Sequence, residues 1–159
     1  MADRARSWMT TFISLVTVFS IVVIDRILKI FFSNILSMGE SIPVIRNFFH
    51  FTLIHNTGIA FGLFKNQGIV FIIIPIIAIV LIAFNIYYRR NNKEVSLMYV
   101  FGFSLIMAGA IGNLIDRVTL GYVVDFIDFR VWPVFNIADS AITIGTILIL
   151  IKCIPSFAK

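Results

Sequence analysis

Long runs without a charged residue are the feature that most constrains the fold of this chain. Residues 7–24, 66–88 and 95–115 contain no charged side chain, and a helix that crosses a bilayer needs about 20 such residues. Hydrophobic residues make up 60% of the 159 residues, which is more than a soluble domain of this size can bury. We therefore expect an integral membrane protein.

The chain is predicted to form a single domain, residues 1–159, of an all-α membrane protein with four transmembrane helices. The helices are expected at about residues 8–32, 67–88, 95–116 and 136–154, and the outer loops at about residues 33–66 and 117–135. In the first loop, Phe49, Phe51 and Leu53 alternate with His50 and Thr52, a pattern typical of a strand with one buried face. This predicts a small extracytoplasmic β-cradle in the first outer loop.

Basic residues predict how the helices are oriented. They gather before the first helix, between the second and third, and after the fourth: Arg4, Arg6, Arg89, Arg90, Lys93, Lys152 and Lys159. Positively charged segments stay on the cytoplasmic side of a membrane, so both termini are expected there and the two loops outside. Because these residues form no basic stripe, we interpret the net charge of +5 as topology and expect no nucleic-acid partner.

Polar residues from three predicted helices fall in one layer near the outer face. Asp25 and Asn113 lie close to the outer boundary, and Asp139 lies about 20 Å from Lys152 at 1.5 Å per residue, slightly below that boundary. A charge inside the bilayer costs about 2.5–3.5 kcal/mol, so such positions indicate pairing or function. Asp25 and Lys29 have the spacing of an ion pair on one helix face.

Two aspartates in this layer are candidates for catalysis. Asp125 follows two valines and has no adjacent basic residue, and Asp139 begins the fourth helix after Pro133. Burial without a cation raises the pKa of a carboxyl group, and a second carboxylate nearby makes the two groups share one proton. That is the state in which an aspartic protease activates water. Asp139 is alternatively a helix N-terminal acid that the dipole stabilises.

Other acids and other chemistries remain weaker alternatives. Asp116 beside Arg117 and Asp128 near Arg130 are interpreted as members of salt bridges.

His50 and His55 lack an acid at zinc-ligand spacing, so we interpret them as packing or hydrogen-bonding residues. A dyad of Ser140 and Lys29 is weakened because Lys29 already has Asp25 as a partner. A small transporter or proton relay is the alternative of another class, but it favours acids staggered through the bilayer.

Five blocks of residues, in order, resemble those of the bacterial lipoprotein signal peptidases, also called type II signal peptidases. The blocks are Asp25–Lys29, Asn56–Gly62, Gly109–Arg117, Val123–Ile127 and Phe135–Asp139. The resemblance implies a metal-free aspartic endopeptidase, without a cofactor, in the bacterial cytoplasmic (inner) membrane. Its substrates would be diacylglyceryl-modified prolipoproteins, cut just before the lipidated cysteine. The implied partners also include membrane lipid and globomycin-type cyclic peptide inhibitors.

The resemblance also implies which residues form the site. Asp125 and Asp139 match the catalytic dyad. The supporting positions are Asp25, Lys29, Asn56, Gly109, Asn113, Asp116, Arg117, Asn136 and Ala138. Among these, Asn113 and Asn136 are expected to donate hydrogen bonds to the dyad or substrate, and Arg117 to fix nearby acids.

The chain departs from the family pattern in two places. Arg26 stands where the family commonly has glutamine, which predicts a change in local pairing but not in the dyad. The connection between Asp125 and Asp139 is short, which predicts a reduced outer segment over the site.

Overall fold

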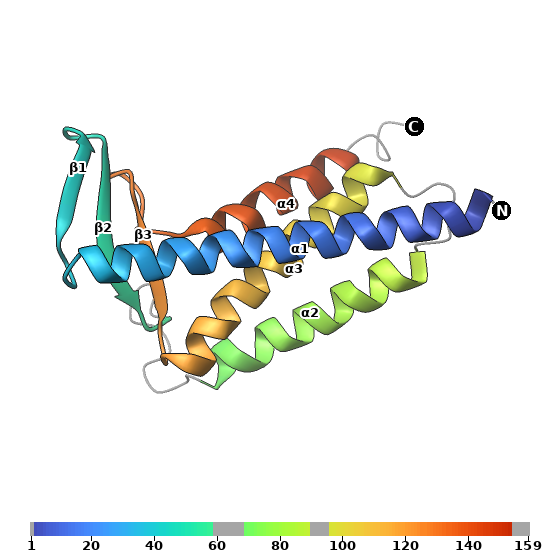
Figure 1. The fold of residues 1–159 in the computed structure, drawn as a ribbon, viewed down its shortest axis with the longest axis horizontal. Coiled ribbons are helices and arrows are strands. Elements are labelled where there is room, and N and C mark those ends of the chain that lie inside the picture. Colours follow the sequence, from blue (N-terminus) through green and yellow to red (C-terminus); the bar gives the residue numbers. More distant parts are fainter. Residues whose placement is uncertain (1, 59–68, 90–95, 154–159) are drawn as a thin grey trace.

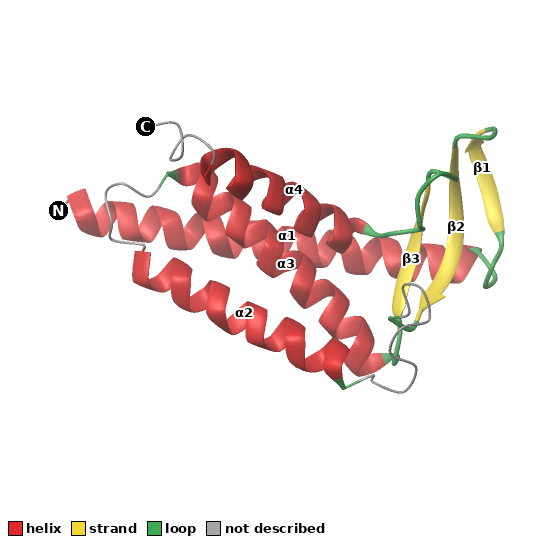
Figure 2. Cartoon of the chain, turned by 180° about the vertical axis from the view of Figure 1, so that it is seen from behind, coloured by secondary structure: helices red, strands yellow, loops and turns green. Residues whose placement is uncertain are grey.

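The computed structural model describes residues 2–58, 69–89 and 96–153, which form a helical bundle with a small sheet across one end (Figure 1). The helices are α1 (Ala2–Ile35), α2 (Val70–Arg89), α3 (Leu97–Thr119) and α4 (Ile137–Cys153). The strands are β1 (Ser41–Ile45), β2 (Phe49–Asn56) and β3 (Val123–Asp128). In the view from behind, the sheet stands across the ends of the helices (Figure 2).

Helix α1 joins the bundle to the sheet. It has 34 residues and extends beyond the predicted end at residue 32, so its last turns lie beside the strands (Figure 1). There Phe32 and Leu36 pack against Leu53, Val124 and Phe126 in a buried apolar cluster. The Phe32 and Phe126 rings stack with their centroids 4.5 Å apart. Burial of these side chains fixes the sheet against the helix end.

The sheet contains a strand that the sequence did not predict. Its order is β1-β2-β3, and both pairs are antiparallel. The small sheet that the sequence predicts is present, with β1 and β2 between residues 33 and 66, but its third strand, β3, comes from residues 117–135. Five of the six β3 residues are buried, and a strand buried on both faces shows no alternation of apolar and polar residues.

Helix α3 is the central helix of the bundle, in contact with each of the other three. It approaches α4 closely because glycines line the contact, among them Gly109 and Gly112. A side chain at Gly109 would meet the backbone oxygen of Ala138, and its Cβ would lie 2.7 Å from Ile142. A Cβ at Gly112 would lie 2.9 Å from Asp25. These glycines therefore let three helices converge at one level.

Two of the described helices, α2 and α3, are long and apolar enough to cross a membrane. Helix α1 adds many large apolar side chains that no part of the described chain covers, among them Trp8, Phe12, Leu15 and Phe19. This is the surface expected where lipid is the solvent. The crossing of all four helices and their orientation stay predictions, and Arg90 and Lys93 lie outside the described residues.

The close contact of α3 with α4 predicts that Gly109→Ala destabilises the fold. Because the new methyl group meets backbone rather than a flexible side chain, we expect a loss of about 1–3 kcal/mol, the usual range for overpacking. Gly102→Ala is the matched control, since its Cβ would lie 3.0 Å from the movable end of Ile149 and 3.2 Å from the Gly145 backbone oxygen, a looser contact than the one at Gly109. Thermal unfolding in detergent should show the larger loss for Gly109→Ala, and equal losses would contradict the packing described here.

Candidate active site

Asp125 lies in the middle of β3 with 1% of its surface exposed. The Asn56 side chain donates a hydrogen bond to one carboxyl oxygen at 2.9 Å, and the Asn136 side chain donates to the other at 2.7 Å. Burial raises the pKa of Asp125 to about 7, although the Asn56 bond opposes the rise, and the charge of Asp139 raises it further. This carboxyl group therefore holds its proton up to about neutral pH.

Asp139 is fixed by the way α4 begins. Asn136 caps the helix: its side-chain oxygen accepts from the Asp139 backbone N–H at 2.9 Å. The Asp139 carboxylate accepts in return from the Asn136 backbone N–H at 3.3 Å, which completes a capping box. Its other oxygen accepts from the Asn113 side chain at 2.7 Å. The interpretation of Asp139 as a helix N-terminal acid was thus correct, and it is compatible with a role in the dyad.

Asn136 connects the two aspartates. Its side-chain N–H₂ group donates to Asp125, while its backbone N–H donates to Asp139. The same N–H₂ group lies 3.1 Å from the Asn113 side-chain oxygen and 3.2 Å from the Val124 carbonyl oxygen. Because Asn136 is fully buried, it holds β3 and the start of α4 at a fixed separation.

A buried layer of charge lies next to these residues. Lys29, with 1% of its side chain exposed, pairs with Asp25 and with Asp116 at 2.8 Å each, and it donates to Asn113 at 3.1 Å. The predicted pair of Asp25 and Lys29 is confirmed. Asp116 has a second cation in Arg26 at 2.7 Å, so the departure at position 26 does change local pairing.

Both acids of this layer also accept a backbone N–H from an element of the site. Asp25 accepts from Ala138 at the start of α4, at 2.9 Å. Asp116 accepts from Val124 at 3.1 Å, next to Asp125 in the chain. The charged layer therefore fixes the backbone beside each aspartate of the candidate dyad.

Other predicted residues lie as follows. The Arg117 guanidinium lies over the Phe71 ring, 5.6 Å from its centroid, instead of pairing with Asp116, whose cations are Arg26 and Lys29. Asp128 pairs with Arg130 at 3.1 Å, which confirms its interpretation as a salt-bridge residue. Burial acts to raise the pKa of Asp128, but hydrogen bonds from Thr52 and Arg130 outweigh it and lower that pKa.

His50, His55 and Ser140 make hydrogen bonds or ring contacts with neighbouring residues of the fold. His50 contacts Ser41 at 3.0 Å, and His55 stacks on Tyr122 with ring centroids 4.1 Å apart, as packing and hydrogen-bonding residues do. Ser140 donates to the Asn136 carbonyl oxygen at 2.9 Å, and that bond gives no support to a serine–lysine dyad. Among residues 2–58, 69–89 and 96–153, no three His, Cys, Asp or Glu side chains are grouped to hold a metal ion.

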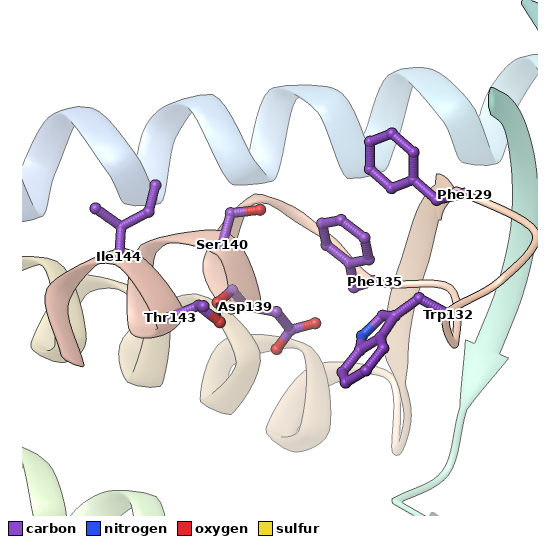
Figure 3. Close-up of a pocket in the computed structure, with 7 residues that line it drawn as sticks. All are labelled: Phe129, Trp132, Phe135, Asp139, Ser140, Thr143 and Ile144. Carbon is purple, nitrogen blue, oxygen red and sulfur yellow. Dashed lines mark hydrogen bonds between the residues drawn. The ribbon is translucent and has the colours of Figure 1, made fainter. Parts of the chain in front are cut away.

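A pocket of about 480 Å³ opens beside Asp139 (Figure 3). Aromatic residues of the β3–α4 connection line one side of it and α4 lines the other: Phe129, Trp132, Phe135, Asp139, Ser140, Thr143 and Ile144. Sequence reasoning missed the aromatic wall, although three aromatic residues within the seven after Asp128 were a visible signal. Asp139 is half-buried and borders this space, whereas Asp125 is buried and is not among its lining residues.

The β3–α4 connection is closed at its base. Phe135 and Ile127 form an isolated bridge, with the Phe135 N–H donating to the Ile127 carbonyl oxygen at 3.0 Å and the return bond at 2.8 Å. Residues 128–134 therefore form a loop whose two ends meet beside the dyad.

Comparison with known proteins shows the family to which this chain belongs. Residues 17–155 match the family model described as Signal peptidase (SPase) II. The chain belongs to the signal peptidase II family. Lipoprotein signal peptidases are similar to this chain over most of its length. That of Halothermothrix orenii is 39% identical over 136 residues, which cover 86% of this chain and 91% of the relative. That of Clostridioides difficile is 45% identical over 130 residues, covering 80% and 85%.

A solved structure of a bacterial membrane enzyme, determined by the in meso method at 2.3 Å, has the same fold with a TM-score of 0.81. It is 35% identical in sequence and covers 91% of this chain and 88% of its own. The family is thus established over nearly the whole chain. Signal peptidase II membership makes the chain a peptidase of bacterial membranes, while the roles of single residues stay predictions.

The charged layer predicts that Lys29→Met destabilises the protein by about 3–5 kcal/mol, because it leaves a buried carboxylate without its cation. Asp116 keeps Arg26, so Asp25 is the acid left without a cation. Adding Asp25→Asn should therefore recover more stability than adding Asp116→Asn. Unfolding of the two double variants in detergent tests this order, and the reverse order would disprove the assignment of partners.

Proposed function

We propose that this member of the signal peptidase II family is an aspartic endopeptidase that removes signal peptides from prolipoproteins, with Asp125 and Asp139 as its catalytic dyad. The observation that carries the proposal is the position of Asn136, which donates a hydrogen bond to each of the two carboxyl groups. Asp125 and Asp139 also influence each other electrostatically. Such a pair, held by neutral amides, suits proton transfer to and from water.

The two aspartates have different environments, which supports different roles. Asp125 is buried and keeps its proton up to about neutral pH, so we assign it as the acid that polarises the scissile carbonyl. Asp139 borders the open pocket, where a water molecule can reach it, and we assign it as the base. When two carboxyl groups have different pKa values, one can act as the general acid and the other as the general base.

In the proposed reaction, Asp139 takes a proton from water as the water oxygen attacks the scissile carbonyl carbon. Asp125 gives its proton to the carbonyl oxygen, and a neutral tetrahedral diol results. Asp139 then returns its proton to the leaving nitrogen while Asp125 regains one from a hydroxyl group, which breaks the C–N bond. Both aspartates end in their starting states.

The substrate class follows from the family and fits the site. The apolar pocket beside Asp139 suits a segment that lies at the membrane surface, and the proposed cut is just before a diacylglyceryl-modified cysteine, whose acyl chains would hold the cleavage site at this depth. Globomycin-type cyclic peptides would compete for the same space. We place the site on the outer side of the cytoplasmic membrane, with four spanning helices and both termini inside.

The first test is cleavage of a diacylglyceryl prolipoprotein by the purified protein and its Asp125→Asn and Asp139→Asn variants. Each variant should lose about 10²–10⁴-fold in rate, the usual contribution of a general acid or base. Asp128→Asn is the matched control on the same strand and should retain most of the activity. Near wild-type cleavage by a folded dyad variant would reject the dyad, and loss of activity in EDTA would reject the metal-free mechanism.

The pH dependence of cleavage gives a second test. Because Asp125 must be protonated and its pKa is raised to about 7, kcat/KM should fall as the pH rises through about 7. Asn56 stabilises the ionised form, so Asn56→Ala should raise the pKa and move this fall to higher pH. Asn85→Ala, which removes an acceptor of Tyr99 elsewhere in the bundle, should leave it in place. A shift to lower pH in Asn56→Ala would contradict the assignment.

A further inference from the structure

A second pocket, of about 310 Å³, lies along α1 and shares no lining residue with the pocket beside Asp139. We call it the α1 groove. Its polar wall includes Arg26, Ser33 and Asn34 from α1 with His55 and Tyr122 from the sheet end, and Ile30 and Leu120 supply apolar surface. The buried Lys29 and Val124 also border it. Neither aspartate of the proposed dyad lines this groove.

Side chains with hydrogen-bond donors line the α1 groove. The Arg26 side chain is 37% exposed and uses one N–H on Asp116. Within the described ranges, the hydrogen bond to Asp116 is the one made by the Arg26 side chain, and the side chains of Ser33 and Asn34 are exposed beside it. A guanidinium has five donors in a planar fork that matches phosphate oxygens. The groove therefore fits a ligand rich in acceptor oxygens.

Arg26 removes the net negative charge that would otherwise repel an anion from the groove. Asp25 and Asp116 carry two negative charges behind it, and Lys29 and Arg26 balance them. An uncharged residue at position 26 would leave one net negative charge, which would repel an anion. With Arg26 the set is neutral, and the outward face of the guanidinium can form a charge-assisted hydrogen bond.

Apolar side chains continue along α1 from the groove toward the membrane-spanning part of the helix. Val23 and Phe19 lie three and seven residues before Arg26, on the same helix face, and both are exposed, while Ile30 and Leu120 line the groove itself. A ligand with both phosphate oxygens and acyl chains matches this division. We propose that the α1 groove binds the phosphate of a phospholipid headgroup, with Arg26 as the charged contact and the acyl chains against this apolar surface.

The test uses the purified full chain in detergent and measures the shift in Tm on adding phosphatidylglycerol, diacylglycerol or inorganic phosphate. Phosphatidylglycerol should raise the Tm with saturation, while diacylglycerol and inorganic phosphate at the same concentrations should not. Equal stabilisation by diacylglycerol would show that acyl chains alone bind and would overturn the proposal. A full shift with inorganic phosphate would assign the groove to free phosphate and overturn the lipid.

Variants of groove residues test whether phosphatidylglycerol binds in the α1 groove. Arg26→Gln should weaken phosphatidylglycerol binding about tenfold, as expected when a charge-assisted hydrogen bond is lost. Arg130→Gln is the matched control, because Arg130 is also a half-exposed arginine paired with an aspartate, and it should bind as the wild type does. Asn34→Ala removes a groove donor outside the charged layer, and should weaken binding even if Arg26→Gln does not fold. Unchanged binding in Asn34→Ala, or in a folded Arg26→Gln, would overturn the proposal.

Discussion

The buried ammonium group of Lys29 is the interaction on which the rest of the site depends. Moving an ion out of water costs several kcal/mol, which is offset only when its partners are close and well placed. Here the partners are Asp25 on the same helix and Asp116 on α3, each at 2.8 Å. Each acid in turn accepts a backbone N–H, from Ala138 and from Val124. One charge on α1 thus positions both the strand and the helix that carry the candidate dyad.

The side-chain amides of Asn113 and Asn136 lie between this charged layer and the candidate dyad, Asp125 and Asp139. Asn113 accepts from Lys29 and donates to Asp139, while Asn136 donates to both aspartates. Amides can donate and accept at once without adding charge, so they separate Lys29 from Asp125 by a layer of hydrogen bonds. This separation is consistent with the raised pKa of Asp125, where burial outweighs the distant cation.

Local features of the sequence predicted much of this arrangement, and non-local contacts explain what it missed. Uncharged runs indicated the helices, the i,i+4 spacing indicated the pair of Asp25 and Lys29, and the lack of an adjacent cation distinguished Asp125 from Asp128. Strand β3 escaped prediction because burial on both faces removes the alternation that marks a strand. The Arg26–Asp116 pair joins residues 90 positions apart, and no sequence spacing reports such a contact. The aromatic wall of the pocket likewise depends on how the β3–α4 connection folds back.

The bridge between Ile127 and Phe135 has a consequence for how this scaffold can vary. It closes the β3–α4 connection at its base, so the separation of Asp125 from Asp139 is set by residues below the bridge and by Asn136. Residues 128–134 lie beyond it and fold back, so that Phe129 and Trp132 line the pocket beside Asp139. Insertions or deletions there change the wall of the pocket while leaving the spacing of the two carboxyl groups intact. The shape of the pocket and the geometry of the two aspartates are therefore separable traits in this architecture.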